Sequence, residues 1–490
     1  MQSVPWRWLA CGAAVLLAQA ACAHPLALPT AHAPDAQASQ MPPAPLGRLE
    51  VSPAKTEVLQ TVSLAADGLP PDTTVALTWQ TVDGGWQIAD YYKFLGKRFQ
   101  AASRPWGEAR TDASGRLDIT LTVPEDYGGV HEIVASVDGV PVARGATEVV
   151  QSFEISATAG AIGSPIAITA RGLGWQTMES TWVLTWDNHE VGWVSAVDTR
   201  GTAVARLRAA GPVGPHYLKL WSGWQGQAYI NHQQAPTWYL PRPEWTFVTT
   251  DDQPELASYV EPYPDQRQFA LTALHGESGA SVTPAQGPIL TEATVTARGL
   301  PPDSDVSIVW ERQLGNRVEA AGFKPDQLTL GAAHVDRDGT LRYAFTVPDD
   351  LGGAHPIRVL AADGRELASA AFAVETSLVS VTPSVVGRGE TFAIQLKGVG
   401  WTEYDNILNL TYDNAYLGYA CGFTSQGDVL VTLTATGAPG VHTIDFYPGL
   451  FKGPPDMPQQ LYRLPQLTYL DDHPGNRLPA VRVTIEVVDD

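Results

Sequence analysis

Residues 181–193 read TWVLTWDNHEVGW, and this stretch contains the local signals that decide the fold. Trp182 and Trp186 share a parity along the first six residues, which predicts a β-strand with one aromatic face that is buried by default. Asp187 and Asn188 have turn chemistry, and Gly192 allows the chain to re-enter the sheet. The stretch therefore predicts a β-hairpin.

Most of this stretch occurs twice in the chain. TWDNHEVGW (185–193) returns as TYDNAYLGY (411–419), 226 residues further on, with the Asp-Asn pair and the Gly-aromatic pair kept. The middle changes from His-Glu-Val to Ala-Tyr-Leu, which is typical of a hairpin tip where only the backbone matters. We interpret the phrase as mostly a requirement of the fold.

Other landmarks repeat with nearly the same offset and indicate a duplicated pair of units. GLPPD (68–72) returns at 299–303, an offset of 231, whereas VPEDYGG (123–129) returns as VPDDLGG (347–353), an offset of 224. The first copy therefore carries seven extra residues between these landmarks. His216 and His442 differ by 226, and Leu240-Pro241 and Leu464-Pro465 differ by 224. The predicted order of units is A-B-A-B.

The A and B units also resemble each other. D-x-x-G occurs at Asp112, Asp198 and Asp336, and G-x-H occurs in all four units, at His131, His216, His355 and His442. Calcium loops and metal ligands are the functional alternatives for these motifs. We favour a tight turn for each D-x-x-G and, for each histidine, a backbone cap at the start of a late strand.

Alternating strands with turn residues every 8–12 positions predict an all-β protein of four tandem immunoglobulin-like (Ig-like) β-sandwiches. The predicted parts are a signal peptide (1–23), a disordered tether (24–47), A1 (48–151), B1 (152–276), A2 with a short linker (277–377) and B2 (378–490). The GLPPDT and GLPPDS entries, the D-x-x-G hairpins and the G-x-H strands resemble bacterial Ig-like modules of the IPT/TIG type. This resemblance implies a spacer, an adhesion surface or an accessory domain of an enzyme, although the B units are unusually aromatic for a plain spacer.

The first residues of the chain indicate where the protein is located, and its net charge limits the classes of partner that it can bind. Arg7 and the apolar run from Leu9 to Ala21 precede an Ala-Cys-Ala site, which predicts cleavage after Ala23 and export from a bacterial cell to the periplasm, the outer membrane or the medium. Lipidation at Cys22 is the alternative. No later segment has 18 consecutive apolar residues, so no membrane span is expected. The net charge of −21 disfavours nucleic acid and anionic lipid as partners.

Catalytic motifs are missing from the sequence, and we expect no enzyme, no cofactor and no metal. Cys421 is expected to be a small buried residue. The acid pairs Asp251-Asp252 and Asp471-Asp472 stand before prolines, which is more typical of a loop start than of an acid/base pair.

Aromatic residues of the B units are the candidates for ligand contact. The segment 221–226, WSGWQG, aligns with 447–453, YPGLFKG, and both are expected to be loops that hold large apolar side chains. The candidate residues are Trp221, Trp224, Trp193, Tyr447, Phe451 and Tyr419. We predict a non-catalytic binding and scaffolding protein that contacts a carbohydrate or protein ligand. The alternatives are a passive spacer or assembly subunit, in which the aromatics pack between domains, and an accessory component of an extracellular hydrolase.

Overall fold

The protein is described from a computed structural model, which covers residues 46–489 except 225, 253, 255–256, 265–278, 317, 320–321, 452–462 and 476. Within these residues the chain forms β-strands and one short 3₁₀ helix, η1 (His232–Gln234). The prediction of an all-β protein is confirmed. In this part of the chain no helix is long and apolar enough to cross a membrane.

The strands form eight sheets in the described residues, and they group into four sandwich-like pairs around four main hydrophobic clusters. The cluster of the second pair also includes Tyr447, Leu467, Tyr469 and Ala480, which lie near the end of the chain. We name the pairs A1, B1, A2 and B2 after the predicted units in which they fall. The number of independent domains and the duplication stay predictions.

The A1 pair stacks sheet β2-β4-β7 on sheet β1-β9-β8-β5-β6, with β3 added beside β9. Alternate side chains of β4 are buried, including Val62 and Leu64, and they pack against Leu77 and Trp79 of β5. The strands are β1 (Gly47–Arg48), β2 (Glu50–Ser52), β3 (Lys55–Thr56), β4 (Thr61–Ala66), β5 (Thr74–Ala89), β6 (Lys93–Arg110), β7 (Leu117–Thr122), β8 (Gly129–Val137) and β9 (Val140–Val149).

The B1 pair stacks sheet β10-β12-β15 on sheet β11-β18-β16-β13-β14, with β17 beside the end of β16. Trp182 and Trp186 of β13 both enter the core, as their shared parity predicts. The strands are β10 (Ser152–Ile155), β11 (Ala159–Ala161), β12 (Pro165–Arg171), β13 (Trp182–Trp186), β14 (His189–Val194), β15 (Ala203–Arg208), β16 (Gly214–Trp224), β17 (Gln227–Ala228) and β18 (Glu244–Thr250).

The A2 pair stacks sheet β20-β22-β25 on sheet β21-β27-β26-β23-β24. Its core is built around Trp310, which occupies the place of Trp79 in A1. The strands are β20 (Ala280–Thr283), β21 (Gln286–Pro288), β22 (Glu292–Ala297), β23 (Asp305–Gly315), β24 (Phe323–His334), β25 (Leu341–Thr346), β26 (Gly353–Ala361) and β27 (Glu366–Glu375).

The B2 pair stacks sheet β28-β30-β33 on sheet β19-β35-β34-β31-β32, with β29 beside β35. Strand β19, which falls inside the predicted range of B1, belongs to this sheet because it pairs with β35. The strands are β19 (Tyr259–Val260), β28 (Ser377–Thr382), β29 (Val385–Gly387), β30 (Thr391–Lys397), β31 (Ile407–Tyr412), β32 (Ala415–Cys421), β33 (Val429–Thr434), β34 (Gly440–Gly449) and β35 (Val481–Val488). Cys421 at the end of β32 is buried, as predicted.

The repeated phrase forms the hairpins β13–β14 and β31–β32, as predicted. Asp187 and Asn188 have φ of 49° and 65°, and Asp413 and Asn414 have 47° and 64°. A two-residue turn with positive φ at both positions matches the twist of the flanking strands, which explains the choice of Asp and Asn. The tip is therefore the Asp-Asn pair, and the variable residues lie in β14 and β32 instead of at the tip.

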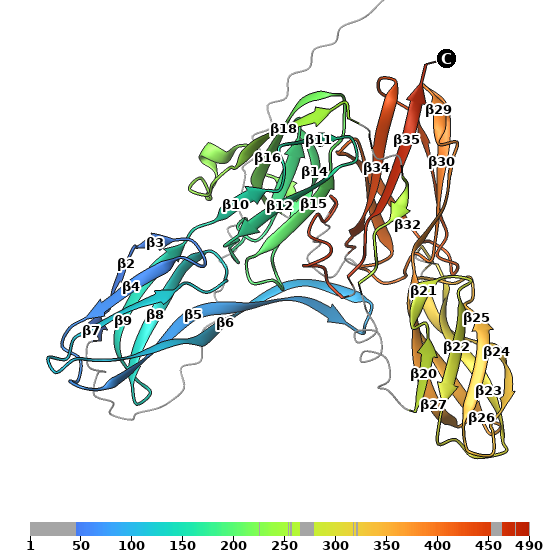
Figure 1. The fold of residues 1–490 in the computed structure, drawn as a ribbon, viewed down its shortest axis with the longest axis horizontal. Helices are drawn as coiled ribbons and strands as arrows, with labels where there is room; N and C mark the ends of the chain where they lie inside the picture. The colour runs from blue at the N-terminus through green and yellow to red at the C-terminus, as the bar shows by residue number, and fades with distance from the viewer. Residues whose placement is uncertain are drawn as a thin grey trace, which may run out of the picture. The chain divides into compact units, whose positions relative to one another are not determined.

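The seven extra residues of the first copy lengthen one hairpin. The span from Thr74 to Arg110, β5–β6, is seven residues longer than its counterpart from Asp305 to His334, β23–β24. Figure 1 shows β5 and β6 as one long blue hairpin that continues past the rest of the A1 sheets. Its tip reaches B1 and B2 through the contacts described in the next subsection.

A buried ionic cluster joins B1 to B2. The Arg208 guanidinium at the end of β15 donates to the Asp445 carboxylate of β34 and, at 2.9 Å, to the carbonyl oxygen of Val483. Arg482 of β35 donates to the same carboxylate at 2.9 Å. Burial alone would raise the pKa of Asp445, but the two guanidiniums hold this pKa below its ordinary value. The aspartate is therefore charged in the folded protein.

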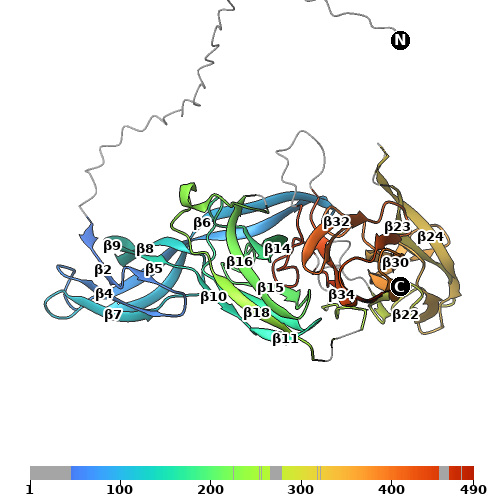
Figure 2. The same ribbon diagram turned by 90° about the horizontal axis from the view of Figure 1, so that it is seen from above.

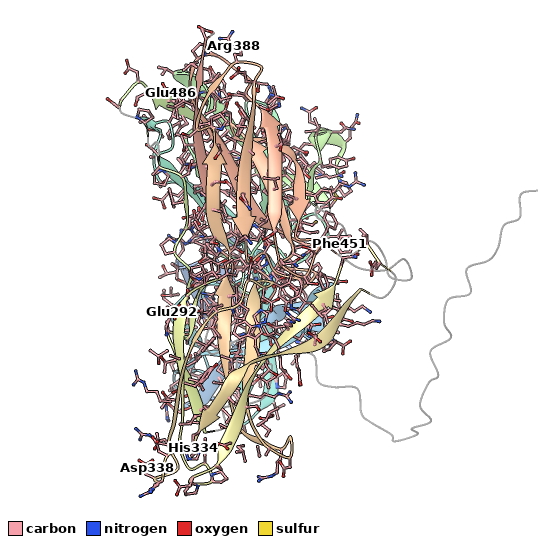
Figure 3. The ribbon with its side chains drawn as sticks, turned by 90° about the vertical axis from the view of Figure 1, so that its right-hand side faces the viewer. Glu292, His334, Asp338, Arg388, Phe451 and Glu486 are labelled. Carbon is pink, nitrogen blue, oxygen red and sulfur yellow. The ribbon has the colours of Figure 1, made fainter. Side chains whose placement is uncertain are left out.

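We expect Arg208→Ala to lower the free energy of unfolding by about 3–5 kcal/mol, because it leaves the Asp445 carboxylate buried with one cation fewer. Chemical denaturation of the two proteins measures this difference. The control is Arg388→Ala, which removes an exposed pair with Asp489 on the surface of B2 (Figure 3). Its expected cost is at most about 1 kcal/mol. Equal costs for both variants would contradict the assigned role of the cluster.

Candidate binding surface

Two of the predicted ligand-contact residues, Trp193 and Tyr447, are buried. Only 1% of Trp193 is exposed, and its Nε1 donates to the carbonyl oxygen of Leu464 at 2.9 Å. The Tyr447 hydroxyl accepts from Arg482 at 2.9 Å, inside the ionic cluster. A ligand cannot stack on a ring that has no exposed face, so the prediction that these two side chains contact a ligand is wrong. Packing between sandwiches, the alternative for these aromatics, fits both.

Trp221 and Trp224 lie on a strand and not in a loop, because pairing of β16 with β17 extends the ladder to Trp224. Trp221 is half-buried and donates from Nε1 to the Thr185 hydroxyl at 3.1 Å. The Lys219 ammonium lies 4.4 Å from the centre of its ring. Trp224 ends the strand, and its side chain lies outside the described part of the structure.

The remaining predicted residues differ in exposure. Phe451 follows β34 and is half-buried, and its backbone N–H donates to the carbonyl oxygen of Glu403 at 2.8 Å (Figure 3). Tyr447 is also on a strand, β34, and not in a loop. Tyr419 of β32 has 65% of its surface exposed. Cys22 lies outside the described residues.

The buried aromatics form a cluster where A1, B1 and B2 meet. Phe94 from the A1 hairpin packs with Trp193 of B1 and Tyr404 of B2. The backbone N–H of Phe94 donates to the Glu403 carboxylate at 2.7 Å, and the N–H of Glu403 donates to the carbonyl oxygen of Tyr92 at 2.9 Å. The tip of the long hairpin is therefore fixed to B2 by both apolar and polar contacts.

Asp472, from the second acid pair, is a fully buried acceptor at this junction. Its carboxylate accepts from the backbone N–H of Asp198 at 2.7 Å, from Nε1 of Trp86 at 3.1 Å and from the Ser195 hydroxyl. Burial raises the pKa of Asp472, and burial together with Asp472 raises the pKa of Asp198 to about 6. The carboxylate joins the A1 hairpin and B1 to B2.

The neighbours of Asp472 have separate structural partners. The Asp471 carboxylate pairs with Arg206 of β15. His473 is buried between the carbonyl oxygen of Tyr404, 2.7 Å from Nε2, and the Gln466 amide oxygen, 2.6 Å from Nδ1. In the first acid pair, Asp252 accepts from the Thr250 hydroxyl at 2.8 Å. These contacts favour structural roles for both pairs.

The D-x-x-G motifs form turns, as predicted. Asp112 Oδ1 accepts from the backbone N–H groups of Ser114 and Arg116 at 2.8 and 2.9 Å, and Gly115 has φ of 78°. The four G-x-H histidines bond backbone carbonyl groups near the start of their strands, as predicted; His131, for example, lies between the carbonyl oxygens of Gln80 and Tyr127. Among the described residues no group of three His, Cys, Asp or Glu side chains is placed to hold a metal ion.

An aromatic pair that the sequence reasoning did not select is exposed on B1. Trp238 and Tyr239 have 68% and 54% of their surfaces exposed. Trp238 alone is exposed among the tryptophans whose side chains the structure describes. A signal was present in the sequence, because the two adjacent aromatics stand between Pro236 and Pro241 in a segment with no strand periodicity.

Backbone and side-chain contacts hold this exposed segment in one conformation. The N–H of Trp238 donates to the carbonyl oxygen of Ala235 at 3.1 Å, and the N–H of Leu240 donates to that of Thr237 at 3.0 Å. The Tyr239 hydroxyl donates to the Glu179 carboxylate, which raises the pKa of Tyr239 to about 12. The two rings meet edge to face with their centres 6.4 Å apart. The segment therefore presents its aromatic surface already ordered.

A cavity of about 270 Å³ offers a second aromatic wall, away from B1. Trp401 of B2 and Tyr91 of the A1 hairpin line it, together with the Arg312–Asp326 ion pair of A2. The ring centres of Trp401 and Tyr92 lie 5.4 Å apart. Trp401 thus packs against the tip of the A1 hairpin.

No protein-family model matches the chain, and no curated protein matches it. Among solved structures it is similar to Salmonella alpha-2-macroglobulin reacted with methylamine, at 10% identity, over 90% of this chain and 31% of that chain, with a TM-score of 0.17. The ICAM-5 D1–D4 ectodomain fragment gives 11% identity, 90% and 100% coverage and a TM-score of 0.18. The intimin C-terminal fragment gives 14% identity over 49% of this chain and 75% of that chain, with a TM-score of 0.18.

The chain spans about a third of the length of the Salmonella protein and 44% of an Escherichia coli alpha-2-macroglobulin chain. TM-scores this low do not establish a common overall fold. The strand pairing of the chain itself makes it an all-β protein with several sandwich-like sheet pairs. The resemblance to IPT/TIG-type modules stays a prediction.

We expect His473→Gln to weaken the dependence of stability on pH between about pH 4 and about pH 6.5. Burial lowers the pKa of His473 from 6.5 to about 4, so in this range the unfolded chain binds a proton that the folded chain does not. The wild type should therefore gain stability as the pH rises through this range. Denaturant unfolding at several pH values measures the difference between the two proteins.

The control is His334→Gln, on the surface of A2 (Figure 3). A hydrogen bond to Asp305 raises the pKa of His334, so its small contribution to stability should be lost, and not gained, as the pH rises. A His473→Gln protein with an unchanged pH profile would contradict the neutral, buried state assigned to this histidine.

Proposed function

We propose that this chain is a non-catalytic, exported binding and scaffolding protein, and that its B1 sandwich contacts a carbohydrate or protein ligand through Trp238 and Tyr239. The observation that carries the proposal is the exposure of Trp238 on an ordered segment, while the other described tryptophans are buried or half-buried. Large exposed aromatic surface is disfavoured in water, and where it is retained it commonly marks an interaction site.

Aromatic rings of this kind suit a ligand with both apolar and polar surface. An indole ring stacks on the C–H face of a sugar or fits an apolar pocket of a protein, and it loses little side-chain entropy when it binds. Because Tyr239 is held by Glu179, the pair is ordered before the ligand arrives. Ordering before binding reduces the entropic cost of association.

The scaffolding part of the proposal is supported by the junction of A1, B1 and B2. A1, B1 and B2 share the aromatic cluster and the hydrogen bonds of Asp472. B1 and B2 also share the Arg208–Asp445–Arg482 cluster, so neither can pair its buried charges alone. A chain of passive spacers needs no such junction. A passive structural role and a role as an accessory component of an extracellular hydrolase remain the alternatives.

The proposed architecture is four Ig-like sandwiches in an A-B-A-B duplication. In A1, Nε1 of Trp79 donates to Asp126 at 2.9 Å; in A2, Nε1 of Trp310 donates to Asp350 at 2.9 Å. Each indole stacks on its G-x-H histidine, with ring centres 4.4 Å apart in A1 and 4.5 Å apart in A2. In B1 and B2 the G-x-H histidines instead meet Asp187 and Asp413, the first residues of the repeated turn. These matched contacts support a common origin for the two copies.

The proposed location is outside the cytoplasm of a bacterial cell, and it is supported by the signal-peptide pattern at the start of the sequence. Cleavage after Ala23 would give a periplasmic or secreted protein, and lipidation of Cys22 would give a membrane-anchored one.

We expect Trp238→Ala to abolish or strongly weaken binding of a glycan that shifts the tryptophan fluorescence of the wild type. Trp238 is exposed, so its emission should shift to shorter wavelength when a sugar ring covers it. The measurement is a fluorescence titration of the full chain with a panel of oligosaccharides, followed by calorimetry for any that respond.

Trp401→Ala is the matched control, because Trp401 lines the separate cavity between A1, A2 and B2. Loss of binding in Trp401→Ala but not in Trp238→Ala would move the site to that cavity. If no glycan binds and acrylamide does not quench Trp238, the exposed aromatic surface on which the proposal rests is refuted.

A further inference from the structure

The end of the β23–β24 hairpin continues past the strand beside it in A2. Strand β26 pairs with β23 from Val306 to Trp310, whereas β24 pairs with β23 as far as Gly315. Figure 2 shows the two strands extending past the other strands of A2. The cavity of about 270 Å³ that Trp401 lines lies beside this extension and is bordered by the start of β26. Its volume is close to the lower end of the range for small-molecule sites, about 300–1,000 Å³.

An ion pair lies on the face of the hairpin that carries the A2 core further along. Arg312 and Asp326 are register partners, and Nε of Arg312 donates to the Asp326 carboxylate at 2.8 Å. Arg312 shares the parity of Trp310, and Asp326 shares that of Leu328, both of which pack in the A2 core. In A1 the counterpart of Arg312, at the offset of 231 that relates the two core tryptophans, is the buried Thr81. The second copy therefore has paired charges where the first has a small buried residue.

The aromatic wall of the cavity is held by contacts from two other sandwiches. The ring of Trp401 is half-buried, and its centre lies 5.4 Å from that of Tyr92 in A1 and 6.1 Å from that of Phe323 in A2. Tyr91, which also lines the cavity, has φ of 69° at the tip of the A1 hairpin. A positive φ is uncommon for a residue with a large side chain. Such positions persist where the surrounding structure fixes them, and they cluster at binding sites.

The counterpart of Trp401 in the first copy is packed differently. Trp175 stands at its position in the repeated G-x-G-W, and the ring centre of Trp175 lies 5.6 Å from that of His131. A Cβ atom on Gly129 would lie 3.4 Å from the Trp175 ring, whereas no atom of Trp401 comes within 4 Å of a Cβ atom on Gly353, the counterpart of Gly129. Trp401 packs instead on the A1 hairpin, and a cavity remains beside the start of β26.

The charges that line the cavity are balanced in pairs. Arg312 pairs with Asp326, and Glu311, which also lines the cavity, pairs with Arg358 at 2.8 Å. A ligand with a net charge would have to compete with an existing partner for either member of a pair. Among the described residues, the two terminal nitrogens of Arg312 have no hydrogen-bond partner. Hydroxyl groups both donate and accept, so they can bond to the guanidinium and the carboxylate without separating them.

We infer that this cavity binds an uncharged sugar residue, stacked on Trp401 and bonded through its hydroxyl groups to the Arg312–Asp326 pair. The apolar C–H face of a sugar ring suits an indole, and its hydroxyl groups suit the ion pair. Gln313 and Gln327, which also line the cavity, carry amide groups that donate and accept. The inference goes beyond the proposed function, because it assigns a second site in which the exposed aromatic pair of B1 takes no part.

Calorimetric titration of the full chain carrying Trp238→Ala tests the inference. The full chain is needed because A1, A2 and B2 each contribute to the walls of the cavity. Trp238→Ala removes the other proposed site, so any remaining binding belongs elsewhere. The ligands are glucose, galactose, mannose and their oligosaccharides, each sugar compared with its uronate and its amino sugar. We expect a neutral sugar to bind, and its two charged counterparts to bind more weakly, because the charges in the cavity are already paired.

Two further changes, made in the Trp238→Ala protein, locate the binding. Trp401→Ala should abolish measurable binding, because it removes the stacking surface. Arg312→Met keeps the length of the side chain and should weaken binding about tenfold to a hundredfold, the usual effect of losing a hydrogen bond to a charged group. The matched control is Arg337→Met, which removes an exposed arginine of A2 that pairs with Asp303 at 3.7 Å. It should bind like its parent, and both arginine variants should keep a melting temperature close to that of the parent.

The outcomes separate this site from the one proposed on B1. If no sugar binds the Trp238→Ala protein, or if binding survives both Trp401→Ala and Arg312→Met, the inference is overturned. If a sugar binds the wild type and Trp238→Ala alone abolishes this binding, the inference fails while the proposed function stands. If Trp238→Ala leaves the binding of the wild type unchanged and both cavity variants lose it, the inference holds and the site proposed on B1 fails.

Discussion

One buried carboxylate, that of Asp472, bonds to both neighbours of B2 at the junction of three sandwiches. Asp472 is fully buried and takes its donors from Trp86 of the A1 hairpin and from Ser195 and Asp198 of B1. A buried acceptor that loses its donors pays the full cost of its desolvation, so separation of either neighbour would leave this group unsatisfied. The long β5–β6 hairpin has its tip in place because of this group and the Glu403 carboxylate. With the tip in this position, Phe94 and Trp193 pack together and are buried from solvent.

The junction decides which aromatics are available for recognition. Trp193 and Tyr447 satisfy their polar atoms through Leu464 and Arg482, and their rings are covered by neighbouring sandwiches. Trp238 and Tyr239 lie on a segment that no other sandwich covers, and Glu179 fixes the tyrosine there. The exposed aromatic pair is therefore one that the packing between sandwiches does not use, and the binding surface that we propose rests on this exposure.

Local chemistry explains which features could be predicted from the sequence. The Asp187-Asn188 turn, the Asp112 turn and the backbone contacts of His131 depend on residues close in sequence or on one strand register, and all three are as predicted. The partners of Trp193, Ser195 and Trp86 are 271, 277 and 386 residues away, so no local pattern contains them. The seven extra residues of A1 were visible as a change of offset, but their reach into B2 was not. Trp238 was overlooked because nearby WSGW had a counterpart in the second copy, although that stretch continues a strand.

The two copies of the proposed duplication have unequal surroundings, because B1 and B2 pack against each other through different surfaces. The edge of B1 receives residues 465–467 of B2, whereas the equivalent strand of B2, β32, lies beside β14 of B1. The phrase TWDNHEVGW and its copy TYDNAYLGY show both the likeness and the difference. Their turns are the same because each hairpin needs the same backbone, and their flanking aromatics differ in exposure because only one is covered.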